Sequence, residues 1–178
     1  MIKTERKMLK INNGDTGLTD GAPGQRVPKH NLAINAVGEL DELNAWLGFL
    51  RAKLFATHQK ISEDIFDLQK LMLEIMAFVS GWQNDVPKLN RDINNFTAKL
   101  EEQILQFELP ELKTFVIPGE CIMSADIHIV RTVCRRAERQ LVALAYSETE
   151  ILEQYIPVIT ILNRISEYLF ELSRYLSK

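Results

Sequence analysis

The sequence predicts an all-α protein, an up-and-down bundle of five helices preceded by an irregular N-terminal arm. Apolar residues recur at steps of three, four and seven along five separate segments, as in helices that bury one face. Strand signals are few, and no internal repeat is detectable. At 178 residues the chain is long enough for one domain around one core. We therefore expect a single domain over residues 1–178, in which residues 1–29 form the arm.

The first three expected helices span residues 31–54, 61–80 and 91–107. Each has an apolar stripe at helical spacing. The stripes are built on Leu40, Leu43, Leu47 and Leu50, then on Ile65, Leu68, Met72 and Ile75, and then on Ile93, Phe96, Leu100 and Ile104. Gly81 is a plausible C-cap of the second helix, and Pro110 ends the third. The intervening residues 82–90 are expected to be a loop.

The fourth expected helix, residues 118–145, is the longest, and Pro118 and Gly119 suit its entry. Its apolar face is predicted to consist of Ile122, Ile129, Val133, Ala137, Leu141 and Leu144. A second stripe along the same helix consists of His128, Arg131, Arg135, Glu138 and Arg139, with Arg136 beside it. This stripe has two interpretations. It is either a solvated, salt-bridged face, or an anion site, since guanidinium groups donate paired hydrogen bonds to phosphate.

An extended apolar link, residues 112–117, leads into the fourth helix, and a polar break at residues 146–156 follows it. Pro157 is expected to open the last helix at a tolerated N-terminal position. Asn163 sits inside the apolar run of that helix. A buried amide needs partners, so Asn163 is expected to bind either a neighbouring element or a ligand.

The arm is rich in glycine and polar residues, and its segment 12–19 admits two interpretations. Glycines let backbone N–H groups converge on an anion, so the segment could cradle phosphate. It lacks the Walker pattern, and an ordinary Asn-Gly turn is the simpler interpretation. Asp41 in the first helix likewise is either a surface residue or the partner of an arginine on the fourth helix.

Composition excludes several classes of protein. The net charge of −3 argues against a general nucleic-acid binder, and no apolar run is long enough for a membrane span. The N-terminal residues lack the apolar region of a secretory signal. Cys121 and Cys134 lie too far apart on one helix to form a disulfide, which suggests a reducing, cytoplasmic location. No CxxC, HExxH or His/Cys cluster predicts a protein-ligated metal.

Five blocks of the chain resemble the PduO-type ATP:cob(I)alamin adenosyltransferases, and together they span nearly its whole length. In order, they read NGDTGLT, GELDELNAWLG, FVIPGE, SADIHIVRTVCRRAERQLVAL and LNRISEYLFELSRY. The fourth and fifth blocks are specific, whereas the first two gain weight from their order and spacing.

The resemblance implies a ferritin-like bundle that forms a homotrimer with its sites between subunits. ATP would lie between the arm of one subunit and the arginine helix of its neighbour, with Mg2+ bound through the phosphate oxygens. Cobalamin would occupy an apolar pocket nearby, and the 5′-deoxyadenosyl group would pass to its reduced cobalt, releasing triphosphate. Hand-off of the product to a cobalamin-dependent enzyme is a further possibility that the resemblance raises.

The resemblance also assigns roles to individual residues. Those that would bind ATP are Asn13, Gly14, Asp15, Gly17, Thr19, Lys29, Arg135, Arg136, Glu138, Arg139 and Asn163. Phe115 would displace the lower ligand of cobalt, and Phe115 and Arg135 would be the catalytic residues. Asp41 and Arg131 would form a salt bridge between subunits.

Five positions depart from the family pattern, and all five concern charge. Asn12, Thr16, Ala33 and Asn35 stand where the family often has charged residues, and Glu120 replaces a glycine. Because each charged hydrogen bond contributes about 1.5–3 kcal/mol, these changes should weaken phosphate binding. Three hypotheses follow: an active adenosyltransferase, a weakened paralogue that binds corrinoid or nucleotide without efficient turnover, and a structural bundle without a ligand.

Overall fold

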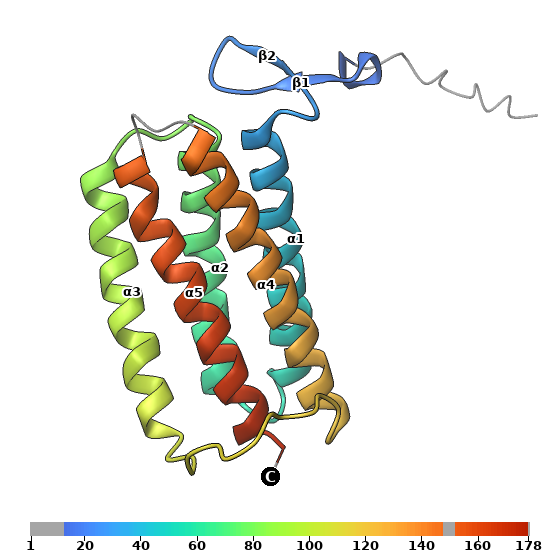
Figure 1. Cartoon of the computed structure of the whole chain (residues 1–178), viewed down its shortest axis with the longest axis vertical. Coiled ribbons are helices and arrows are strands. Elements are labelled where there is room, and N and C mark those ends of the chain that lie inside the picture. The colour runs from blue at the N-terminus through green and yellow to red at the C-terminus, as the bar shows by residue number, and fades with distance from the viewer. Residues whose placement is uncertain (1–12, 148–151, 178) are drawn as a thin grey trace, which may run out of the picture.

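A computed structural model describes residues 13–147 and 152–177 and contains five helices in an up-and-down bundle (Figure 1). The helices are α1 (Leu32–Leu54), α2 (Gln59–Val79), α3 (Val86–Gln106), α4 (Ile122–Ser147) and α5 (Leu152–Tyr175). Before them lie the 3-10 helix η1 (Asn13–Thr16) and a two-stranded antiparallel hairpin, β1 (Leu18–Asp20) and β2 (Arg26–Pro28). The predicted all-α bundle with an irregular arm is confirmed.

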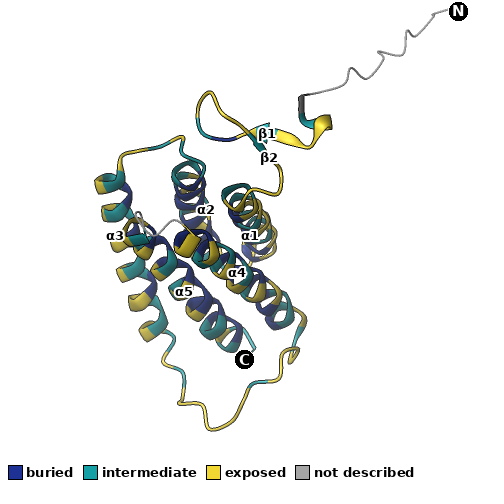
Figure 2. Ribbon diagram, turned by 45° about the horizontal axis from the view of Figure 1, so that its top comes forward, coloured by how far each residue is buried: buried dark blue, intermediate teal, exposed yellow. Residues whose placement is uncertain are grey.

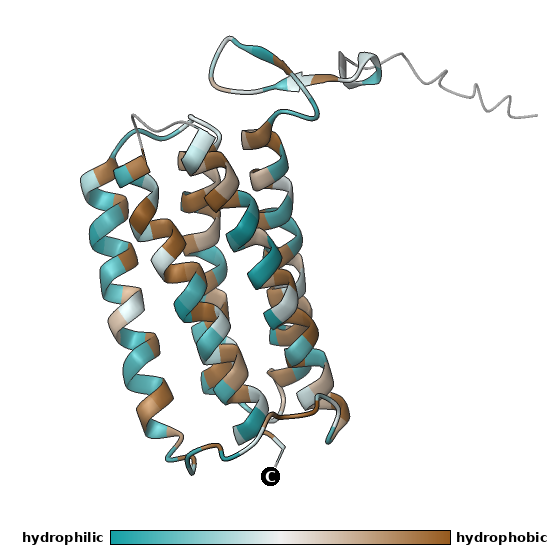
Figure 3. Cartoon of the chain, in the orientation of Figure 1, coloured by the Kyte–Doolittle hydropathy of each residue, from teal (hydrophilic) through white to brown (hydrophobic). Residues whose placement is uncertain are grey.

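Each helix turns one face toward the common core (Figure 2), and hydropathy varies around the helices rather than along whole helices (Figure 3). On α1 the buried leucines, which include Leu40, Leu43 and Leu47, are fully inaccessible to solvent. Asn31 caps this helix, because its Oδ1 accepts a hydrogen bond of 2.8 Å from the Ala33 N–H. No helix within the described ranges 13–147 and 152–177 is long and apolar enough to cross a membrane.

Three helix starts differ from the predictions by more than two residues, for local reasons. Helix α3 begins at Val86, within the expected loop, because Asp85 caps it and Pro87 is tolerated in its first turn. Helix α4 begins four residues later than predicted, because the chain before Ile122 includes Gly119 at φ 114°, outside helical conformation.

Helix α5 begins earlier than predicted, so Pro157 lies inside it rather than at its start. Much of the expected polar break is therefore helical, and residues 148–151 lie outside the described residues.

The buried face of α4 is also rotated relative to the prediction. Ile122 and Ile129 are 79% and 44% exposed, so their assignment to the core was wrong. The residues that occupy the core instead include Ile127, Val130 and Cys134. The remaining apolar positions of the predicted face, from Val133 to Leu144, are buried as expected.

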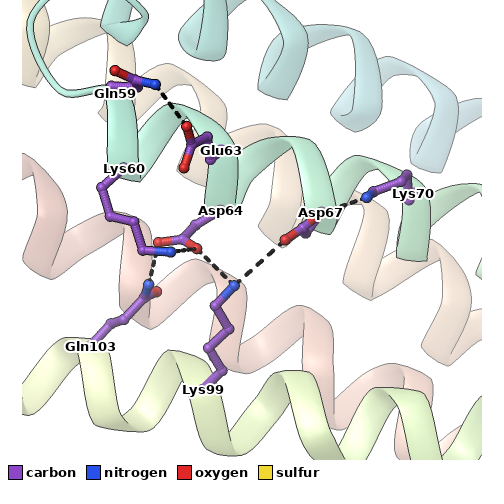
Figure 4. A network of polar contacts seen from close by, with 8 residues as sticks. All are labelled: Gln59, Lys60, Glu63, Asp64, Asp67, Lys70, Lys99 and Gln103. Atoms are coloured by element: carbon purple, nitrogen blue, oxygen red, sulfur yellow. Dashed lines mark hydrogen bonds and ion pairs between the residues drawn. The ribbon is translucent and has the colours of Figure 1, made fainter.

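A polar network joins α3 to α2 (Figure 4). The Asp64 carboxylate, only 5% exposed, accepts hydrogen bonds from Gln103 Nε2 at 2.6 Å and from Lys60 Nζ at 3.2 Å. Lys99 Nζ lies 2.7 Å from the same carboxylate and 3.8 Å from Asp67. A buried carboxylate must be compensated in this way, so these contacts link α3 to α2.

Candidate functional site

Arg135 near the middle of α4 is held in place by two neighbours. Its Nη1 donates a hydrogen bond of 2.9 Å to Asn163 Oδ1 on α5 and lies 2.8 Å from Glu138 Oε2 one turn along α4. The buried Glu138 Oε2 has no aligned hydrogen bond, so that contact is an ion pair. The Arg135 side chain remains 44% exposed, which leaves donors available for an anion.

The expectation that Asn163 is buried was wrong, because the residue is exposed. Its amide nevertheless has a partner on a neighbouring helix, since its oxygen orients Arg135. The predicted contact with a neighbouring element is therefore confirmed, although the residue is not buried.

Arg136, the next residue, points to α1 instead. Its Nε lies 2.5 Å from Glu39 Oε2, and its Nη2 contacts Glu42. Hydrogen bonds to Glu39 and Glu42 raise the pKa of Arg136, and the Arg136 hydrogen bond lowers the pKa of Glu42. The salt-bridged interpretation of the stripe therefore holds for Arg136, whereas the partly exposed Arg135 fits an anion site.

Arg139, one turn beyond Arg135, is exposed. Within the described part of the chain it has no ion pair. At this spacing its guanidinium lies on the same side of α4 as that of Arg135.

The arm hairpin brings its predicted phosphate-loop residues together. The Lys29 N–H donates to Gly17 O at 2.9 Å, and Gly17 N–H donates to Gly14 O at 3.3 Å. The Lys29 ammonium lies 3.4 Å from where a Gly14 Cβ would be, and Gly17 has a φ of 78°, which favours glycine. Asp15 is exposed in the same turn.

Thr19 lies on β1 opposite Val27. The side chain of Asn13 and the whole of Asn12 lie outside the described residues, so the expectations for them stay predictions.

The arm is attached at the end of the bundle where α1 begins, and η1 extends away from the helices (Figure 1). Its turn touches the bundle at Ala22, whose Cβ is 3.0 Å from where a Gly81 Cβ would be. Arg135, in contrast, lies midway along α4. A single chain thus builds the two halves of the expected nucleotide site but holds them apart.

A cleft of about 760 Å³ lies near the opposite end of the bundle. Its walls combine the link before α4 with residues of α4 and α5. The lining residues are Leu112, Lys113, Thr114, Phe115, Val116, Pro118, His128, Arg131 and Phe170. Phe115 is fully exposed on the link. A mostly apolar cleft with an exposed aromatic side chain suits a large planar ligand.

Two helical residues of this cleft, His128 and Phe170, have no site role in the sequence-based prediction. His128 appears in the charged stripe, but spacing alone does not show that it is only 4% exposed. Phe170 lies in the last of the five blocks, and its position beside Arg131 depends on the packing of α4 against α5.

Asp41 and Arg131 are not brought together within one chain. Asp41 is exposed on α1, and no ion pair joins it to a described residue. Arg131 Nε instead donates to His128 Nδ1 at 3.2 Å. Glu120 precedes α4, whereas Arg135 lies midway along that helix, so the two are well separated within one chain.

Within residues 13–147 and 152–177, no group of three His, Cys, Asp or Glu side chains is placed to hold a metal ion. Cys121 and Cys134 are free thiols, and burial raises the pKa of the Cys134 thiol, so this group stays protonated.

Residues 9–176 match the family model described as cobalamin adenosyltransferase. A cobalamin adenosyltransferase of Cupriavidus metallidurans is 35% identical over 176 residues, covering 96% of this chain and 88% of that protein. A corrinoid adenosyltransferase of Bacillus subtilis is 34% identical over 176 residues, covering 93% and 84%.

A solved structure shows a variant of the PduO-type ATP:corrinoid adenosyltransferase from Lactobacillus reuteri complexed with cobalamin and ATP. It has a TM-score of 0.78 and 28% identity to this chain, and the match covers 95% of this chain and 90% of that one.

Proposed function

Because this chain belongs to the cobalamin adenosyltransferase family, we propose that it transfers the 5′-deoxyadenosyl group of ATP to the cobalt of cob(I)alamin. The cobalt electron pair attacks C5′, a cobalt–carbon bond forms, and the C5′–oxygen bond breaks. Triphosphate leaves with the electrons of that bond, and cobalt becomes Co(III). The observation that carries this proposal is the half-exposed Arg135 guanidinium, held by Glu138 and Asn163.

Triphosphate gains charge as it leaves, so fixed cations facing it lower the barrier. Arg135 is the catalytic cation in this proposal, and Arg139 extends the same surface. Glu138 and Asn163 hold Arg135, which reduces the reorganisation needed when charge develops. Mg2+ bound through phosphate oxygens would supply further charge neutralisation, since the described residues offer no separate metal cluster.

The arm is proposed to bind the phosphates from the other side. The Lys29 ammonium lies over Gly14 beside the backbone turn, where it would contact the phosphates together with Asn13, Asp15, Gly17 and Thr19. Since the arm extends away from its own α4, the phosphates would meet the arginines of a different subunit.

The assembly proposed on this basis is a homotrimer of single-domain subunits, with residues 1–29 as the nucleotide-binding arm. Asp41 and Arg131, not paired with each other within one chain, would meet across the subunit boundary. Phe49 on α1 and Ile129 on α4 are 40% and 44% exposed, which favours coverage of these helices by a neighbour.

Phe115 is proposed to occupy the lower face of the corrinoid. A phenyl ring offers cobalt no donor atom, so it can fill the position of an axial ligand without binding the metal. The cleft beside it has the volume and the apolar lining for a large planar ligand.

Full turnover is favoured over the weakened paralogue, because Asn163 and Glu138 hold Arg135 in place while its guanidinium stays partly exposed. The free thiols fit a reducing, cytoplasmic location. Delivery of adenosylcobalamin directly to a dependent enzyme is a further proposal.

The decisive assay follows adenosylcobalamin formation by absorbance, with cobalamin kept reduced and with ATP and Mg2+ supplied. Conversion that requires both ATP and this protein is expected. Absence of conversion under strong reduction, with tight corrinoid binding retained, would favour the weakened paralogue.

Mixing subunits tests whether sites form between chains. Lys29→Ala damages the arm and Arg135→Ala damages the helix, so each variant trimer alone should be nearly inactive. After co-refolding, about a quarter of the sites should combine an intact arm with an intact helix and recover activity. A mixture of Lys29→Ala with the double variant Lys29→Ala/Arg135→Ala is the matched control, because every arm then lacks Lys29 and no intact site can form.

A further inference from the structure

His128 of α4 lies at the bottom of the cleft, and both of its ring nitrogens are engaged. The side chain is buried, at 4% exposure. Its Nδ1 is 3.2 Å from Arg131 Nε, and its Nε2 is 3.2 Å from Ser173 Oγ on α5. Ser173 Oγ in turn is 2.6 Å from the Phe170 carbonyl oxygen. The contacts form one chain from Arg131 to the backbone of α5.

The partners fix the direction of every hydrogen bond in that chain. A guanidinium N–H can only donate, so His128 Nδ1 must accept and the ring proton must sit on Nε2. His128 Nε2–H then donates to Ser173 Oγ, and the Ser173 hydroxyl donates to the Phe170 carbonyl. His128 is thus a neutral imidazole in a single tautomer.

The electrostatic surroundings favour the same state. Burial lowers the pKa of His128, and the Arg131 charge lowers it further, while Glu120 on the link opposes them. Helix α5 faces the ring with the Ser173 hydroxyl and the Phe170 ring, whose centroid is 6.0 Å from the imidazole.

The same contacts restrict Arg131. Its Nε is used by His128, and its guanidinium carbon lies 6.0 Å from the Phe170 ring centroid. One edge and one face of the planar Arg131 guanidinium are therefore fixed. The two Nη groups form the remaining edge, and no ion pair within the described residues uses them.

We propose that His128 is a positioning residue that aims the Nη edge of Arg131 out of the cleft wall toward a carboxylate of an adjoining subunit, Asp41 in the proposed trimer. This inference rests on the proposed function for its kinetic readout. The tautomer of His128, with its proton on Nε2 and with Nδ1 accepting from Arg131, does not depend on the proposed function or on other subunits. An imidazole is suited to the task because its two nitrogens brace Arg131 against α5.

Two amide substitutions test the contacts of the two His128 ring nitrogens one at a time. In His128→Asn the amide oxygen can occupy the place of Nδ1 and still accept from Arg131 Nε. In His128→Gln the amide reaches the place of Nε2, so the contact with Ser173 survives and the acceptor for Arg131 is lost. We expect His128→Gln to reduce kcat/KM for cobalamin about tenfold and His128→Asn about twofold, with the KM for ATP unchanged in both.

A double-mutant cycle tests whether His128 acts through Arg131. In an Arg131→Met background the Asn and Gln substitutions should have equal effects, because the group they position is gone. Equal losses for the two amides in the wild-type background, or losses that add to that of Arg131→Met, would overturn the proposal.

Nitrogen-15 NMR of the imidazole gives a readout that does not depend on catalysis. Protonated Nε2 with unprotonated Nδ1 at neutral pH is expected, and the reverse tautomer would overturn the inference even in an active enzyme. Conversely, an inactive protein with the expected tautomer would reject the proposed function and leave the contact between His128 and Arg131 standing.

Discussion

The arm and the arginine stripe of α4 are two halves of one proposed site, yet they are built in opposite ways. The described part of the arm, residues 13–29, is a thin hairpin with mostly exposed side chains. Backbone hydrogen bonds and glycine conformation determine its shape. The four arginines of the stripe, Arg131, Arg135, Arg136 and Arg139, stand on a packed helix. Three of them contact other side chains of the bundle: Arg131 contacts His128 on α4, Arg135 contacts Asn163 on α5, and Arg136 contacts Glu39 on α1. The helix half is therefore held by side chains of the packed bundle, whereas the arm half is held mainly by its own backbone.

The largest expected effect on catalysis is that of removing the Arg135 side chain. Arg135→Ala should lower kcat by about 10²–10³-fold, as expected when a fixed donor to developing negative charge is removed. Steady-state rates of adenosylcobalamin formation measure this effect. Arg91→Ala is the matched control, because Arg91 is an exposed helix arginine on α3 paired only weakly with Asp92 at 3.5 Å. Similar losses in both variants would contradict the role of Arg135.

The second effect concerns charges that support the fold and not the site. Asp64→Asn should reduce the free energy of unfolding by about 2 kcal/mol, because the buried acceptor of Lys99 and Gln103 loses its charge. Lys60 and Lys99, which pair with Asp64, can turn toward water, and this limits the loss of stability. Denaturant unfolding measures it, and kcat should stay unchanged. The control Asp67→Asn, one turn along α2 and half exposed, should change stability by less than about 0.5 kcal/mol.

A third, smaller effect tests the backbone of the arm. Gly17 has a φ of 78°, so Gly17→Ala strains the turn, whereas Gly17→Asn is better tolerated there. We expect the KM for ATP to rise about fivefold for alanine and less for asparagine, with the melting temperature unchanged. A fall in melting temperature comparable to that of Asp64→Asn would show that the arm is part of the cooperative core.

The smallest effect on catalysis should come from Arg136, although it adjoins Arg135. Since its guanidinium is occupied by Glu39 and Glu42, Arg136→Ala should loosen α4 from α1 slightly and leave the KM for ATP unchanged. Calorimetry and ATP titration measure the two quantities. A tenfold weaker interaction with ATP would instead restore the nucleotide-binding role that the sequence resemblance assigns to this residue.

The bundle was predictable because each of its helices carries a local periodic signal. The errors fall where a second element decides the outcome. Ile122 and Ile129 are apolar and correctly spaced, yet they are exposed because α4 presents a face rotated from theirs to α1 and α5. Pro157 can open a helix, but in this chain the helix already begins at Leu152.

The candidate site divides in the same way. Arg135 and Glu138 were predictable as partners because a spacing of three places them on one side of a helix. The choice of Glu39 and Glu42 by Arg136 was not predictable, since it depends on how α4 packs against α1, which lies far away in the chain.

By itself, the sequence determined which segments are helical, which residues are charged on α4, and which family the chain resembles, because propensity, periodicity and motif are properties of nearby residues. Only the tertiary structure decided which arginines are occupied and which remain available, where the cleft lies, and that arm and stripe are separated within one chain. Those outcomes depend on side-chain partners contributed by distant segments, and a carboxylate two helices away has no signature in the local pattern.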